Sequence, residues 1–337
     1  MAWWRQDPLI QNGYSRVPGD LPINPNRDKA APVGKGGLGL VSPRPFVMKA
    51  LIFGHVHKDP HDERRTQTWR RKFVRVVLDD EKRSGRTTTR SEIMRKPQKM
   101  LPVALVTGAS RRLGIGFAVA QQLARRNYHV ILAARNLEQS EELAFGLCHQ
   151  GFRASAIRLD LADSSSIADV AATVGNAFSH VDVLINNASH MPDFQTACPL
   201  DVDIKVLRAL FEVNVFGCWH LTQALLPLLK RARAARIVNV TSSAAQQIGK
   251  PRPGPIFSPA YSLAKHTLNN LTVVLAQALA NTAVKVNAID PGSVATHPER
   301  GDNAFDRSPE EAAKDVVWAA TLDAAGPSGC IFSAARR

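Results

Sequence analysis

From Met100 onwards, short apolar runs alternate with longer amphipathic stretches. Runs of five to seven mostly apolar residues are typical of buried strands, whereas longer stretches with a 3.6-residue period are typical of helices. The predicted strands are Val103–Thr107, His129–Ala134, Ala154–Asp160, Val181–Asn186, Arg236–Thr241, Lys285–Asp290 and Gly329–Phe332. The predicted helices are Ile115–Arg126, Leu137–Gln150, Ser164–Phe178, Ile204–Leu229, Pro259–Leu279 and Pro309–Leu322.

Strands that are apolar throughout and alternate with helices predict a parallel sheet covered on both faces. The last helix even carries a start signal, because Ser308 is followed by Pro309 and, three residues on, by Glu311. The fold class we expect is α/β, with a single doubly wound Rossmann-type domain and a seven-stranded parallel sheet over residues 100–337.

Residues 1–99 lack such a pattern. Residues 1–47 are rich in Pro, Gly and Asn without a sustained period, which indicates irregular chain. Residues 1–99 also carry 21 Lys and Arg against 10 Asp and Glu, and so hold most of the chain's formal charge of +14. We expect a largely disordered basic extension, or an over-long translation start.

Two features of this extension suggest other functions. Basic residues with interleaved aromatics at 69–77 can bind nucleic acid or an anionic membrane, but such runs are more often solvated tails, so we expect no specific nucleic-acid partner. The spacing of His55, His57 and Asp59 resembles half of a metallohydrolase site, but further ligands are missing nearby, and we expect no metal.

Four scattered cysteines without a Cys-x-x-Cys pair argue against a zinc ribbon or a disulfide framework. Neither a run of 18 apolar residues nor a secretory signal is found, so we expect no membrane span and a cytoplasmic location.

A glycine-rich loop joins the first predicted strand to the first predicted helix. It runs from Thr107 to Gly116 and contains Gly108, Gly114 and Gly116. Glycines let the backbone approach a pyrophosphate, and the helix amino terminus supplies free amides. The order strand, glycine loop, helix predicts a dinucleotide site.

The end of the second predicted strand bears on the choice of cofactor. An acidic residue there usually binds the ribose of NAD, but this chain has Arg135, with Arg111 and Arg112 in the glycine loop. Because guanidinium groups match a phosphate well, we expect NADP(H), without excluding NAD(H).

Tyr261 and Lys265 lie four residues apart near the start of a predicted helix, and therefore on one face. An ammonium favours a neighbouring phenolate, so the pair can transfer a proton near neutral pH. Tyr261 is a candidate proton donor to a carbonyl oxygen.

Together these motifs resemble the short-chain dehydrogenase/reductase family, in particular its carbonyl-reducing members, over residues 101–332. The resemblance depends on their order. The glycine loop is followed by Asp160-Leu161, Asn186-Asn187-Ala188-Ser189, Asn214-Val-Phe-Gly217, Ser242-Ser243, Tyr261-Ser-Leu-Ala-Lys265 and Pro291-Gly292-Ser-Val294-Ala-Thr296.

The resemblance implies a role for each catalytic residue. Tyr261 is the general acid, and Lys265 assists it and binds the nicotinamide ribose. Ser243 donates to the substrate carbonyl, with Ser242 as the competitor, and Asn214 anchors a water that relays protons. For the cofactor, it implies Gly108, Ser110, Arg111, Arg112, Gly114, Ile115, Gly116, Arg135, Asp160, Leu161, Asn187, Ala188, Ser189, Pro291, Gly292, Val294 and Thr296, besides Tyr261 and Lys265.

This chain departs from the family pattern in four places. Its glycine loop is two residues longer, Ser189 replaces a glycine, and residues 250–255 form a proline-rich insertion. Few residues separate Thr296 from the last helix, so we expect an open pocket. We expect an NADPH-dependent reductase of an aldehyde or ketone, and a homo-oligomer, either dimer or tetramer. The alternatives are a 3-oxoacyl thioester reductase, an NADP-dependent alcohol dehydrogenase and a non-catalytic nucleotide sensor.

Overall fold

The structure, a computed structural model, describes residues 101–194, 196–249, 254–297 and 306–334. The expectations for residues 1–99, including the basic run and the histidine pair, lie outside the described residues. So do Lys250, Arg252 and much of the segment between Thr296 and the last helix.

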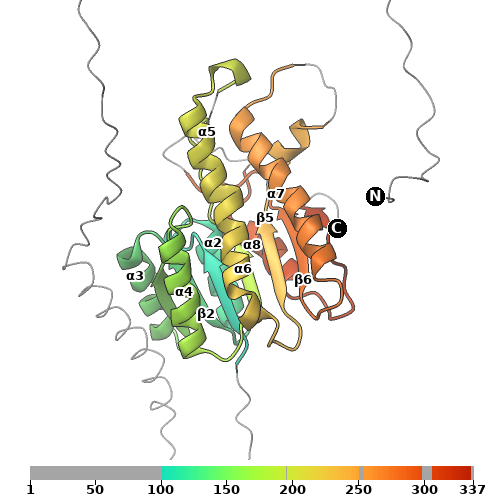
Figure 1. The fold of residues 1–337 in the computed structure, drawn as a ribbon. Coiled ribbons are helices and arrows are strands. Elements are labelled where there is room, and N and C mark those ends of the chain that lie inside the picture. Colours follow the sequence, from blue (N-terminus) through green and yellow to red (C-terminus); the bar gives the residue numbers. More distant parts are fainter. Residues whose placement is uncertain (1–100, 195, 250–253, 298–305, 335–337) are drawn as a thin grey trace, which may run out of the picture. The chain divides into compact units, whose positions relative to one another are not determined.

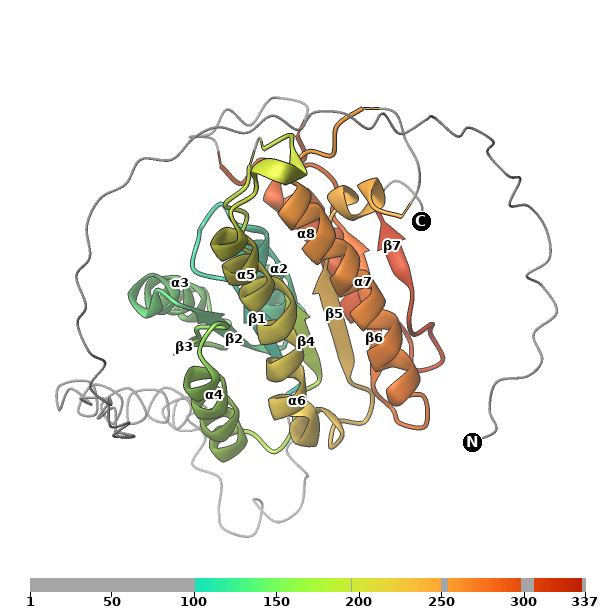
Figure 2. The same cartoon turned by 45° about the horizontal axis from the view of Figure 1, so that its top comes forward.

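Seven strands form one parallel sheet with helices packed against it (Figure 1). Their order is β3-β2-β1-β4-β5-β6-β7 (Figure 2). They are β1 (Val103–Thr107), β2 (His129–Ala134), β3 (Ala154–Arg158), β4 (Val183–Asn186), β5 (Arg236–Val240), β6 (Lys285–Asp290) and β7 (Ile331–Ser333). The doubly wound Rossmann-type fold is confirmed.

The helices are α2 (Ile115–Arg125), α3 (Leu137–His149), α4 (Ser164–Ala177), α5 (Ile204–Phe211), α6 (Cys218–Leu229), α7 (Pro259–Ala278) and α8 (Pro309–Ala320). Short turns complete the chain: the 3-10 helices η1 (Pro199–Asp201) and η3 (Ser243–Gln247), and the π-helix η2 (Glu212–Gly217). Where the sequence predicts one helix over 204–229, the structure thus has α5 and α6 joined by a π turn. The apolar period continues through the turn, so it gives no sign of the change.

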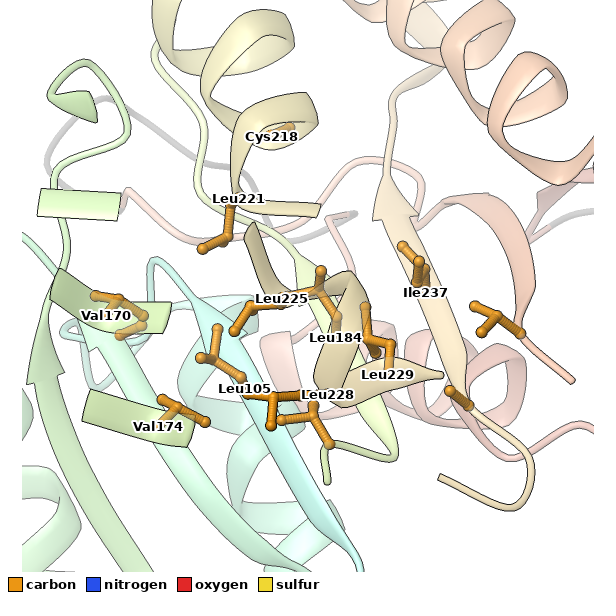
Figure 3. Packing of buried hydrophobic residues seen from close by; sticks show 14 of the residues in the cluster. Leu105, Val170, Val174, Leu184, Cys218, Leu221, Leu225, Leu228, Leu229 and Ile237 are labelled. Atoms are coloured by element: carbon orange, nitrogen blue, oxygen red, sulfur yellow. The ribbon is translucent and has the colours of Figure 1, made fainter. Parts of the chain in front are cut away.

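The two faces of the sheet bury separate apolar clusters. Helices α4, α6 and α7 contribute to one cluster, and α2, α3 and α8 to the other. Figure 2 shows α4, α6 and α7 lying across the same side of the sheet. In Figure 3, Leu105, Leu184 and Ile237 of three strands lie near Leu225 and Leu229 of α6. Burial of both faces explains why the inner strands are mostly apolar.

Strand order reverses direction between β1 and β4. The chain runs from β1 outwards to β3 and then returns to add β4 on the other side of β1. In sheets of this kind the loops at the carboxyl ends of two such strands diverge and leave a crevice for ligands. The glycine loop follows β1, and Asn187 follows β4, so both predicted cofactor segments lie at this crevice.

His129 is buried within β2. Its Nε2 lies 3.1 Å from Ser155 Oγ on β3, and its ring meets Phe178 edge-on at 4.8 Å between centroids. Burial, helped by the charge of Arg153, lowers the pKa of His129 to about 4. The folded protein therefore holds this imidazole in the neutral form.

We expect His129→Gln to weaken the fall in the free energy of unfolding as the pH drops below about 6.5. The folded-state pKa lies below the unfolded value of about 6.5, so the folded protein is disfavoured progressively as pH falls from about 6.5 to about 4. The wild type loses about 3 kcal/mol through this residue over that window. Urea unfolding at several pH values should show the variant without that component. A wild type and variant that lose stability in parallel would contradict the expectation.

Candidate active site

Thr107 locks the carboxyl ends of β1 and β4 together. Its hydroxyl donates to the Ile185 carbonyl (3.2 Å) and accepts from the backbone amides of Asn187 (3.0 Å) and Ala188 (2.9 Å). The Asn187 amide nitrogen donates in turn to the Thr107 carbonyl at 2.8 Å. The two predicted cofactor segments therefore have a fixed spacing.

Two loop glycines are required by close approaches. Gly108 has φ +67°, and a Cβ there would lie 2.8 Å from Ala188 Cα. A Cβ on Gly116 would lie 2.6 Å from Asn187 Nδ2. Helix α2 begins without a side-chain cap and without an acidic residue in its first turn. Its amides can therefore bind an anion, which is what a pyrophosphate requires.

The three predicted phosphate arginines do not lie together. Arg111 crosses the crevice, donates to the Thr296 carbonyl at 2.7 Å and bonds to the His297 ring. Arg112 faces Glu142 on α3 at 3.8 Å, with both side chains largely exposed. Arg111 thus links the glycine loop to the segment after β6, whereas Arg112 lies on the side of α3.

Arg135 stands exposed at the end of β2. In the loop after β4, the pKa of His190 is lowered. The larger cause is burial of the ring, and the smaller is the nearby positive charge of Arg135. Arg135 therefore places positive charge beside the loop after β4.

The other predicted cofactor residues stand at the carboxyl ends of their strands. Asp160 accepts a bond from the Ala162 amide at 3.1 Å, and Leu161 is buried. Gly292 donates to Asp290 Oδ1 at 3.0 Å, and Val294 pairs with Arg307. Ser110 and Ser189 lie in the loops at the same edge, Ile115 is the first residue of α2, and Pro291 follows β6.

Lys265 lies beneath Tyr261 on α7. The lysine is only 2% exposed, its ammonium donates to the Val240 carbonyl at 2.8 Å, and it lies 5.5 Å from the centroid of the Tyr261 ring. Tyr261 itself is half-buried. The predicted pair therefore shares one helix face, at the end of β5.

Asn214 lies in the π turn and is 1% exposed. Its side chain donates to the His190 carbonyl and accepts from the His190 amide, both at 2.8 Å. A single side chain thus holds the loop after β4 against the helix that follows.

The two serines after β5 differ in their surroundings. Ser242 is half-buried, and its Oγ accepts from the Ala244 amide at 3.2 Å to cap η3. Ser243, the residue expected from the sequence, is the exposed first residue of η3.

The start of α7 is held by residues that the sequence analysis did not single out. Asp193 Oδ2 accepts from the backbone amides of Ala260 (2.8 Å) and Tyr261 (3.2 Å). Gln247 bonds to both backbone groups of Phe257 and to the Ser262 hydroxyl. Only tertiary contacts reveal these roles, because Asp193 and Gln247 both lie outside the helix that they hold.

Among the described residues, no group of three or more His, Cys, Asp or Glu side chains is placed to hold a metal ion. Within the same residues, no helix is both long and apolar enough to cross a membrane.

Comparison with protein families identifies this architecture. The family model for short chain dehydrogenases matches residues 102–306, more than half of the chain. This protein belongs to the short-chain dehydrogenase family. It is therefore an oxidoreductase acting on CH–OH or C=O groups, in a family that binds NAD(P).

Several proteins named as oxidoreductases or as a short-chain dehydrogenase are similar to it. An uncharacterized oxidoreductase from Staphylococcus epidermidis is 31% identical over 65% of this chain and 90% of its own. Short-chain dehydrogenase anuI from Penicillium roqueforti is 34% identical over 65% and 88%. Oxidoreductase UcpA from Escherichia coli is 32% identical over 62% and 74%.

Solved short-chain dehydrogenase structures agree. One from Shigella flexneri, complexed with NADP, has a TM-score of 0.61 and 27% identity, and the match covers 69% of this chain and 97% of that one. One from Salmonella enterica serovar Typhi has a TM-score of 0.62 and 26% identity, covering 71% and 98%.

Proposed function

We propose that this short-chain dehydrogenase is an NADPH-dependent reductase of aldehydes or ketones, with Tyr261 as the proton donor. The observation that carries the proposal is the buried Lys265 ammonium beneath the Tyr261 ring, at the same sheet edge as the glycine loop. Bound NADPH supplies the hydride, and the residues of this chain position the carbonyl and manage the proton.

Tyr261 protonates the carbonyl oxygen as negative charge develops there. The Lys265 ammonium stabilises the phenolate that is left. Asn214 fixes the loop after β4 through His190, and we keep for it the water-anchoring role that the family resemblance implies. The chain retains both Tyr261 and Lys265, which favours an enzyme over a non-catalytic sensor.

A second donor to the carbonyl oxygen comes from the serines after β5, and burial favours Ser242 over Ser243. A donor stabilises a developing oxyanion best where water is excluded. Ser242 Oγ accepts a hydrogen bond from the Ala244 amide through a lone pair. The proton of the Ser242 hydroxyl can therefore be donated to a substrate. Ser243 is exposed.

NADPH is favoured over NADH by charge at the ribose end of the crevice. Arg135 occupies the end of β2, where an acidic residue would repel a phosphate, and Arg112 lies towards α3. Arg111 has a different part, because its guanidinium bonds to Thr296 and His297. The solved Shigella flexneri structure carries NADP, which is consistent with this choice for a relative.

The reverse reaction, oxidation of an alcohol, uses the same residues. Reduction of a 3-oxoacyl thioester is the second substrate class. It depends on the basic residues Lys250 and Arg252, which lie outside the described residues.

The protein is proposed to act as a homo-oligomer, as family members generally do. Large apolar side chains are exposed along η2, α6 and α7, including Phe216 (51%), Trp219 (39%) and Val274 (53%). Apolar side chains of this size gathered on neighbouring elements are typical of subunit interfaces.

We expect Tyr261→Phe to lower kcat by about 100- to 10,000-fold, because the phenyl ring has no proton to give. The affinity for NADPH, measured by fluorescence titration, should stay unchanged. Oxidation of NADPH against a panel of aldehydes and ketones measures turnover. Tyr128→Phe, at a half-buried tyrosine outside the proposed site, is the matched control and should keep full activity. Equal activity in both variants would refute the role of Tyr261.

Each of the two serines serves as the control for the other. We expect Ser242→Ala to lower kcat by about 100- to 1,000-fold, as does loss of an oxyanion donor elsewhere. Ser243→Ala should lose far less, because its side chain is exposed. A larger loss of kcat in Ser243→Ala than in Ser242→Ala would instead support Ser243, the donor that the sequence predicts.

Arg135→Ala should raise the KM for NADPH by about tenfold or more and leave the KM for NADH unchanged, because it removes a charge-assisted bond to the ribose phosphate. Arg125→Ala, an exposed arginine at the far end of α2, is the control. Steady-state kinetics with both cofactors decides the matter. A parallel change in both KM values would contradict phosphate recognition.

A further inference from the structure

The carboxylate of Asp193 caps a helix to which it does not belong. Helix α7 starts at Pro259 after Ser258, whose backbone is left-handed (φ 47°) and whose side chain makes no capping bond. Pro259 has no amide proton, so the first free donors of the helix are Ala260 and Tyr261. Both donate to one oxygen of Asp193, which lies in the loop after β4.

A second bond joins the same two segments. The Ser258 amide donates to the Thr196 carbonyl at 2.8 Å. The loop after β4 is thus paired with the start of α7 at two points. At its other end this loop carries Asn187 and Ala188, whose amides are locked to Thr107 in the nucleotide crevice.

Asp193 is only 5% exposed, and its Oδ1 is buried without a hydrogen-bond partner among the described residues. Burying a carboxylate with one oxygen unpaired is costly. The positive end of the α7 dipole and two amide donors offset this cost at Oδ2. A neutral capping residue within the segment before α7 would cost less free energy to bury than a carboxylate. Such a residue, however, would not join α7 to the loop after β4.

We infer that Asp193 is a positioning residue for the proposed reaction, one that sets the first turn of α7, and with it the Tyr261 phenol, relative to the nucleotide crevice. Lys265 is anchored separately, by the Val240 carbonyl one turn further along. Loss of the carboxylate frees the turn that carries the phenol and leaves the ammonium in place. The inference rests on the proposed function, because it presumes that Tyr261 acts on a carbonyl.

Asp193→Ala in the full chain should lower kcat by about 10- to 100-fold, the loss expected from a displaced catalytic group. The affinity for NADPH should stay within about twofold, because the crevice is locked by Thr107 rather than by Asp193. Asp193→Asn keeps one acceptor oxygen for the amides and should restore part of the lost kcat. Hydrogen exchange at the amides of Ala260 and Tyr261 should accelerate in Asp193→Ala, and less in Asp193→Asn.

Asp163→Ala is the matched control, because Asp163 caps α4 through the Ser165 amide at 2.9 Å. It should accelerate exchange at the start of α4 and leave kcat unchanged. Unchanged kcat in Asp193→Ala, despite faster exchange at α7, would overturn the inference. So would a matching loss of NADPH affinity, which indicates general damage.

If Asp193→Ala does not fold, the Asp193→Asn variant tests the inference instead. A lowered kcat with intact NADPH affinity would support it, whereas full activity with accelerated exchange would refute it. If the wild type reduces no carbonyl in the panel, the proposed function fails. The exchange measurement then tests separately whether Asp193 holds the start of α7.

Discussion

A buried ammonium sets the constraints on this site. An unpaired charge in a protein interior is very costly, so the surroundings of Lys265 must satisfy it. The Val240 carbonyl does so at the end of β5, and the Thr241 hydroxyl reaches the backbone carbonyl of Lys265 itself. The charge of Lys265 also acts on the Cys218 thiol of α6. Burial raises the pKa of the Cys218 thiol to about 11, against a smaller opposing effect of Lys265. The ammonium of Lys265 thus ties α7 to the end of β5 and acts electrostatically on α6.

The remainder of the site is built by backbone groups that side chains from other segments hold in place. Thr107 holds the loop after β4 against β1, Asn214 holds it against the π turn, and Asp193 holds it against α7. The loop after β4 is therefore bonded both to the glycine-loop side of the crevice and to the start of α7. The proposed reaction needs these two sides in register, because hydride and proton would reach neighbouring atoms of one substrate.

The sequence predicts the layers of the fold well, because each buried strand is a continuous apolar run bounded by turn residues. The sequence does not predict the polar contacts between segments that are far apart along the chain. The π turn at Glu212–Gly217 interrupts no apolar period, and the two partners of Asp193 are 67 and 68 residues away. Arg111 has the charge to bind a phosphate, but its guanidinium bonds to Thr296, a choice that only folding decides. Ser242 and Ser243 are adjacent residues of one type, and only burial separates them.

The link between Arg111 and Thr296 joins residues 185 positions apart. During synthesis the glycine loop emerges early, whereas the backbone that receives Arg111 emerges only after β6. Contacts of such separation form late, since loop-closure entropy must be met before they contribute. A ribosome-bound chain can pair β1 with β2 and β3 long before its nucleotide crevice is complete. The link across the crevice can therefore form only after the segment that follows β6 has been synthesised.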